Sequence, residues 1–341
     1  MNSASPKPQA PSPWDAFIDG LMRVKRAPWL VIGLWLATVV VALPVAMLLQ
    51  SQLDAHLGAS LAAQSAAEGV NYDWWNEFLA QTSGIGVSFV PAIIGFAAVM
   101  KNLSAVVDRT GVPLTVGVTI GAHMVVSLFL IGGVLDRLAR DRAIGPGAFF
   151  SACGVYAVRF LRLAIIATAI YWVLFVPYHE WLFDGLYPAL IADVTVERTA
   201  FLYRVLLYAA FLAPLLLVNV IVDYAKVRAV VEDRRSMIGA LVAGWRFVRR
   251  HPGAAIALYA LDALLFLVVI GLYFLAAPGG TAPDVIAFAV GQLYIVLRVI
   301  VRLQFAASQI ALFQGRLAHA GYVARPVPKW PDSPAAEALG P

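Results

Sequence analysis

Six stretches of this sequence are apolar enough to cross the hydrocarbon core of a membrane, which takes about 20 apolar residues in a helix. The run WLVIGLWLATVVVALPVAMLL at 29–49 is an example. Hydrophobic residues make up 61% of the chain and charged residues only 13%, too few to cover a water-soluble surface. We therefore predict an all-α, polytopic membrane helical bundle. The expected spans are about 28–49, 114–135, 163–182, 201–222, 254–276 and 286–311.

The charges predict how the chain is oriented. One further apolar segment, 84–100, is short and interrupted by glycines and by Pro91. If it does not cross, the basic clusters all fall on one side of the membrane, which the positive-inside rule assigns to the cytoplasm together with both termini. We therefore predict that 84–100 is a re-entrant or interfacial segment on the outer face. The basic clusters lie at 7–26, 137–142, 226–250 and 316–329.

Amphipathic segments precede some of the spans. In MIGALVAGWRFVRR, residues 237–250, the apolar residues lie on one helical stripe and the arginines elsewhere, with Ser236 as the expected N-cap and Pro252 ending the helix. Such a helix lies in the inner membrane interface, where its arginines meet anionic headgroups. We expect interfacial helices at about 13–26, 147–160 and 237–250, in a single membrane domain covering 1–323. The proline-rich remainder, 324–341, is expected to be a disordered cytoplasmic tail.

Two of these segments align with each other. Gly20 matches Gly244, and VKRAP at 24–28 matches VRRHP at 248–252. A weaker third copy, FFSACGVYAVRFLRL at 149–163, lacks the proline. The pattern suggests three units, each made of a surface helix followed by two spans. The alternative is that surface helices entering a bilayer generally end in basic residues, with no repeat behind them.

The stretch DYAKVRAVVEDRRS at 223–236, followed by the amphipathic helix, two arginines, a proline and a span, resembles a bacterial family. The family comprises poorly characterised six-helix membrane proteins similar to the membrane domain of glycerophosphodiester phosphodiesterases. The resemblance covers mainly 223–275 and implies a helical bundle in the bacterial inner membrane. In that family the phosphodiesterase chemistry belongs to a separate barrel domain, which this chain has no room for, so the resemblance supplies no catalytic residue.

Three charged residues fall inside predicted spans. Asp262 lies about 10 residues beyond Pro252, roughly 14 Å along the helix, and Arg298 and Arg302 reach a similar depth in the last span. An unpaired charge there costs on the order of 3 kcal/mol, so we expect Asp262 to pair with one of the arginines. The spare arginine either extends to the interface or holds an anion such as a lipid phosphate or a substrate carboxylate.

The outer loop holds a second cluster, Asp73, Glu77, Trp74 and Trp75, on a helix that Asn71 caps. Paired carboxylates could bind a cation or act as acid and base. Tryptophans at that depth are also typical of the aromatic belt of a membrane protein, and this simpler interpretation is favoured.

No metal-binding, nucleotide-binding or nucleophile motif occurs in the sequence, and the lone Cys153 is expected to be a packing residue. We predict a non-enzymatic protein without cofactors that binds lipid through anionic headgroups at the cytoplasmic face, or that supports a membrane complex. Nucleic acid is not an expected partner, whereas a protein partner or a second copy stays open. The alternative is a transporter or exporter subunit for an anionic or amphiphilic substrate, and a membrane-embedded enzyme is the least favoured.

Overall fold

The computed structural model describes residues 11–68, 71–89, 101, 103–105, 107–278 and 282–319, and in these residues it is all-α, without a strand. Six helical segments are long and apolar enough to cross a membrane, which confirms the predicted count. The chain is a multi-pass membrane protein. The candidate spans are Pro28–Leu57, Leu114–Arg140, Pro146–Ile191, Glu197–Val231, Pro252–Ala276 and Asp284–Leu317.

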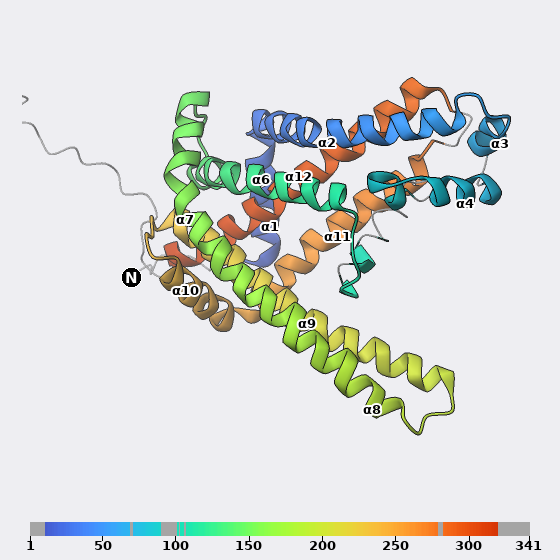
Figure 1. Cartoon of the computed structure of the whole chain (residues 1–341). Helices are drawn as coiled ribbons and strands as arrows, with labels where there is room; N and C mark the ends of the chain where they lie inside the picture. Colours follow the sequence, from blue (N-terminus) through green and yellow to red (C-terminus); the bar gives the residue numbers. More distant parts are fainter. Residues whose placement is uncertain are drawn as a thin grey trace, which may run out of the picture.

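The helices, labelled in Figure 1, extend beyond several of the predicted ends. They are α1 (Pro13–Lys25), α2 (Pro28–Leu57), α3 (Ala62–Glu68), α4 (Tyr72–Gln81), α6 (Leu114–Arg140), α7 (Pro146–Val173), α8 (Tyr187–Ile191), α9 (Glu197–Val231), α10 (Met237–Arg250), α11 (Pro252–Ala276) and α12 (Asp284–His319). Of the segment 84–100, Gly84–Ser88 forms a 3₁₀ helix, whereas 90–100 and the tail 324–341 lie outside the described residues.

Local sequence explains where the surface helices begin and end. Ser12 and Asp15 form a capping box at the start of α1, and the Ser236 hydroxyl accepts a hydrogen bond from the backbone of Gly239 at the start of α10. Pro28 and Pro252 start α2 and α11, since proline fits the first helical position but not a helix interior. Each proline therefore separates a surface helix from its span.

The predicted break between an interfacial helix at 147–160 and a span at 163–182 is wrong. Residues 146–191 form one continuous helical segment, which passes through two π-helical stretches, Leu174–Tyr178 and Trp181–Leu186. The cause is the missing proline, because nothing in the sequence stops the helix after Arg162. The N-terminal part of α7 is thus a surface helix fused to its span.

The three predicted sequence units agree with the way the helices pack. The second span of each unit is α6, α9 or α12, and these three helices contact one another. Each surface helix packs most extensively on the second span of the preceding unit: α7 on α6, α10 on α9, and α1 on α12. The last contact joins the beginning of the chain to its end and closes a ring. Figure 1 shows the three surface helices at the same end of the bundle, while α8 and α9 diverge from α2 and α6 at the other.

Small residues permit these crossings. A Cβ atom on Gly20 would lie 2.8 Å from the backbone nitrogen of Ser308, and one on Gly244 would lie 3.1 Å from that of Ala225. On α6, a Cβ atom at Gly133 would lie 2.6 Å from the Sγ of Cys153, which is buried as the sequence predicts. Because Gly20 corresponds to Gly244, Ser308 on α12 corresponds to Ala225 on α9.

The main hydrophobic core lies at the surface-helix end, where the crossings occur. Its fully buried members include Leu138 of α6, Tyr224 of α9, and Ile310 and Phe313 of α12. Farther along the spans most apolar side chains are exposed, as expected of helices whose outer surfaces face lipid. The three crossings, α1 on α12, α7 on α6 and α10 on α9, therefore determine where the side chains at this end of the protein lie.

Replacing Gly20 by alanine tests the closest crossing. The added methyl group meets backbone atoms of α12, which cannot rotate away, so we expect a loss of about 1–3 kcal/mol in the free energy of unfolding despite the higher helix propensity of alanine. The measurement is thermal unfolding in detergent micelles. Gly33→Ala is the matched control, because a Cβ atom there meets nothing within 4 Å. Equal stability of the two variants would contradict the crossing.

Candidate functional site

Asp262 is not paired with an arginine, so the predicted ion pair is wrong. The carboxyl is 0% exposed, and its Oδ2 accepts a hydrogen bond of 2.6 Å from the hydroxyl of Ser308 on α12. Its Oδ1 is buried without a hydrogen-bond partner among the described residues. Helix α1 packs on both α11 and α12, with Gly20 against Ser308, so that protein covers the carboxyl.

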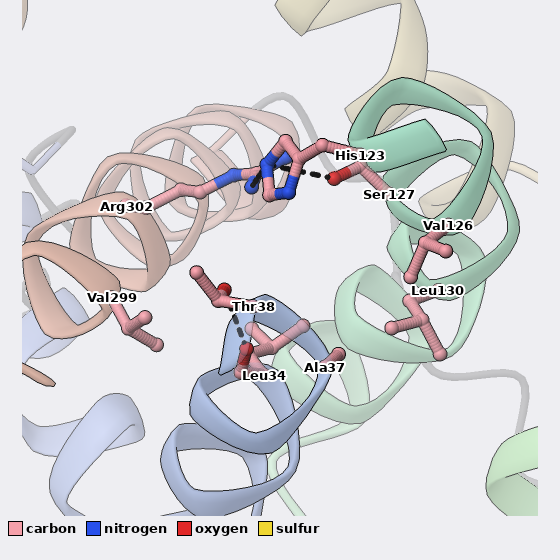
Figure 2. Close-up of a pocket in the computed structure, with 9 residues that line it drawn as sticks. All are labelled: Leu34, Ala37, Thr38, His123, Val126, Ser127, Leu130, Val299 and Arg302. Carbon is pink, nitrogen blue, oxygen red and sulfur yellow. Dashed lines mark hydrogen bonds between the residues drawn. The ribbon is translucent and has the colours of Figure 1, made fainter. Parts of the chain in front are cut away.

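Helical geometry explains why the arginines do not reach Asp262. Arg302 lies six residues before Ser308, about 9 Å along the axis and on a different face of the helix. Its guanidinium Nη1 lies 3.2 Å from the Nε2 of His123 on α6, above Thr38 of α2 (Figure 2). These residues line a cavity of about 20 Å³, room for about one water molecule. Arg298 instead stacks over the ring of Tyr294, 5.6 Å from its centre.

The outer cluster does not form one site. Asp73 and Glu77 are exposed, and Glu77 accepts a hydrogen bond from Gln81. Trp74 is buried and stacks on Phe78, while Trp75 donates to the carbonyl of Phe89. The predicted cap is confirmed, since Asn71 accepts from the backbone of Trp74. The two tryptophans thus pack against protein while the two carboxylates face outward.

Five arginines line one cavity of about 530 Å³ at the surface-helix end, between α9, α10 and α12. We call it the arginine cavity. Phe313 and Phe247 form part of its apolar wall, and the Phe313 ring lies 5.3 Å from the guanidinium of Arg228. Its basic residues are Arg228, Arg234, Arg246, Arg250, Arg316 and, next to Arg316, His251.

Only one carboxylate balances these charges among the described residues. Glu232 binds Arg228 through a 2.7 Å contact and also binds Arg234. Burial acts to raise the pKa of Glu232, but the hydrogen bonds from the two arginines outweigh it and hold the pKa below its usual value. Arg246 and Arg250 are exposed, and neither forms an ion pair within the described part of the chain. The cavity is therefore strongly electropositive.

His251 joins the cavity at the start of α11. Its Nδ1 lies 3.2 Å from the Nη1 of Arg316, and its ring packs against Phe247. Burial lowers the pKa of His251, and the charges of Arg316 and Arg250 lower it further. The imidazole is therefore neutral at pH 7, with Nδ1 able to accept a hydrogen bond from Arg316. The Nε of Arg316 is buried without a partner among the described residues.

The sequence shows the basic clusters but not their convergence. Arg234, Arg246 and Arg250 lie in the basic cluster at 226–250, whereas Arg316 begins the sparser cluster at 316–329, near the end of the last helix. It enters the cavity because α12 continues well past the predicted end near residue 311. The sequence contains no signal that places Arg316 beside α10, because the position of α12 depends on a long-range contact, that of Gly20 with Ser308.

Comparison with known proteins finds no matching family model, curated protein or solved structure. No group of His, Cys, Asp and Glu side chains suitable for a metal ion occurs in the residues that the structure describes. What the arginine cavity can do chemically is hold an anion. Guanidinium groups bind phosphate and carboxylate oxygens through pairs of charge-assisted hydrogen bonds.

Double-mutant cycles test the observed partner of Asp262. Asp262→Asn combined with Ser308→Ala is expected to show a coupling of about 0.5–3 kcal/mol in the free energy of unfolding, because the two side chains share a buried hydrogen bond. Asp262→Asn combined with Arg302→Gln is expected to be additive within about 0.5 kcal/mol. Coupling in the second cycle and additivity in the first would show instead that Asp262 pairs with Arg302.

A pH titration tests the environment of His251. Its pKa is lower in the folded protein than the ordinary 6.5, so the unfolded chain binds the proton more tightly. The contribution to stability is therefore fully present above pH 6.5 and lost as the pH falls below that value. We expect the unfolding temperature of lipid-free protein to decline over this window, and less so in His251→Gln. An identical decline in both proteins would show that the folded protein does not lower the pKa of His251.

Proposed function

We propose that this protein is a non-enzymatic, integral membrane protein that binds an anionic lipid headgroup in the arginine cavity. The observation that carries the proposal is the convergence of five arginines on one cavity, while among the described residues a single carboxylate, Glu232, binds two of them. Clustered arginines at a membrane surface attract anionic lipids. The proposal places the cavity on the cytoplasmic side of a bacterial inner membrane, with both termini on that side, in agreement with the positive-inside rule.

The exposed faces of the surface helices support this role. Ile238, Val242 and Trp245 of α10 are exposed although they are apolar. On α1 the same holds for Trp14 and Ile18. Apolar residues of this kind insert at the boundary between headgroups and acyl chains. Val242 also lines the arginine cavity, as do Arg246 and Arg250, about one and two helical turns farther along α10. A lipid beside α10 can therefore place its headgroup in the cavity and leave its tails in the bilayer.

A second function, transport of an anionic or amphiphilic substrate, rests on a different observation. Arg302 lies within a span, and its guanidinium Nη1 lies 3.2 Å from the Nε2 of His123. Intramembrane arginines often mark substrate pathways. Flux of anionic amphiphiles in proteoliposomes that disappears in Arg302→Gln would favour transport. Lipid binding without flux favours the first function, which the much larger arginine cavity supports better.

Lipid-dependent stability tests the first proposal. Phosphatidylglycerol added to protein in neutral detergent is expected to raise the unfolding temperature more than phosphatidylcholine does, since a ligand that binds only the folded state stabilises it. Changing Arg246 and Arg250 together to glutamine should remove most of this difference. Arg198→Gln is the matched control, because this exposed arginine lies at the opposite end of α9. A full lipid response in the double variant, or none in the wild-type protein, would contradict the proposal.

A further inference from the structure

In two of the three units, an arginine and an aspartate at the surface-helix end form an ion pair at equivalent positions. Arg26, which follows α1, binds Asp141 at the end of α6 with a distance of 2.5 Å. Arg159 of α7 binds Asp233 at the end of α9, also at 2.5 Å. Both aspartates adopt a left-handed backbone conformation, each with a φ of 47°. In each of these two units, therefore, an arginine in or directly after the surface helix binds an aspartate that lies one or two residues beyond the end of the second span.

The helix crossings identify the corresponding positions in the third unit. Gly20 meets Ser308 and Gly244 meets Ala225, so Ser308 and Ala225 are equivalent. Continuing along both helices from this pair, Asp233 on the α9 side corresponds to Arg316 on α12. The match of VKRAP to VRRHP likewise makes Arg250 the counterpart of Arg26. The third unit thus has two arginines, Arg250 and Arg316, at the positions that an arginine and an aspartate occupy in the other two units.

These two arginines both line the arginine cavity. Like charges at the site of an ion pair destabilise the folded protein. Burial, and then the charges of Arg316 and Arg250, lower the pKa of the neighbouring His251. Glu232 is already shared between Arg228 and Arg234 and forms no ion pair with Arg250 or Arg316. We call each of these three equivalent positions a corner. Within the described residues, the corner of Arg250 and Arg316 therefore lacks the carboxylate that the other two corners contain.

We propose that the phosphomonoester headgroup of a lipid occupies this corner and takes the place of the missing carboxylate, bridging Arg250 and Arg316. This inference rests on the proposed lipid-binding function and names the headgroup class. A phosphomonoester carries up to two negative charges and three terminal oxygens, so it can satisfy two guanidinium groups at once. A cavity of about 530 Å³ accommodates such a group. The Nε of Arg316, which has no hydrogen-bond partner in the part of the chain that the structure describes, provides one further donor.

Arg316→Asp tests the inference by restoring the charge pattern of the other two units. In lipid-free detergent we expect this variant to unfold about 2–4 °C above the wild-type protein, because Arg250 gains a partner. Phosphatidic acid, a phosphomonoester lipid, should bind the wild-type protein at least about tenfold more tightly than phosphatidylglycerol, and should lose that advantage in Arg316→Asp. The matched control is Asp233→Asn, which breaks an occupied pair and should lower stability without changing the lipid preference.

Each other outcome has a distinct meaning. If both anionic lipids bind the wild-type protein equally well and Arg316→Asp changes neither affinity, the phosphomonoester site is overturned while lipid binding stands. If neither lipid binds better than phosphatidylcholine, the proposed function fails as well. If inorganic phosphate gives the full thermal shift at the same concentration, the ligand is a free anion and the lipid source is overturned. A wild-type cavity that contains a carboxylate of the chain's own residues 320–341 would overturn all ligand assignments.

Arg250→Gln provides a second comparison if Arg316→Asp does not fold. Removing one of two like charges should raise the unfolding temperature of the lipid-free protein and weaken the binding of phosphatidic acid. Arg26→Gln, at the equivalent position of the first unit, removes one member of an existing ion pair. It should lower or leave unchanged the unfolding temperature and leave lipid binding intact. Opposite signs for these equivalent arginines support the inference, and equal effects contradict it.

Discussion

The close crossing between each surface helix and a neighbouring span is the contact on which the rest of the structure depends. At Gly20 and Gly244 the helix backbones approach so closely that only a hydrogen atom fits between them. Helices inside a membrane gain little from the hydrophobic effect, so they associate through this kind of tight backbone packing. The three crossings gather α6, α9 and α12 and enclose the main core at one end of the bundle.

The same crossings determine where charge can be buried. Asp262 is covered by α1 and receives a hydrogen bond from Ser308, the crossing residue of α12. Arg316, a little over two turns farther along that helix, enters the arginine cavity. A protein interior tolerates charge only where a partner exists. Two units contain both members of the ion pair within the chain, and the third presents two arginines, Arg250 and Arg316, to the arginine cavity.

The sequence predicts the fold far better than it predicts the site. Long apolar runs, Pro28 and Pro252, and the cap residues Ser12 and Ser236 act locally, so the spans and two of the surface helices could be placed from the sequence. The fusion of the third surface helix with its span follows from a missing proline, a weaker signal. Long-range pairing could not be predicted. Depth alone suggested that Asp262 meets an arginine, whereas the rotation of α12 about its axis turns Ser308 toward it.

An experimental structure of the protein in nanodiscs containing phosphatidic acid tests the central claim most directly. The account requires phosphate density within hydrogen-bonding distance of both Arg250 and Arg316, with the acyl chains passing along the apolar face of α10. The phosphate should then play the role of the Asp141 carboxylate in the first unit, and both guanidinium groups should bind it. An empty cavity at saturating lipid, or one filled by a carboxylate of the chain itself, would contradict it.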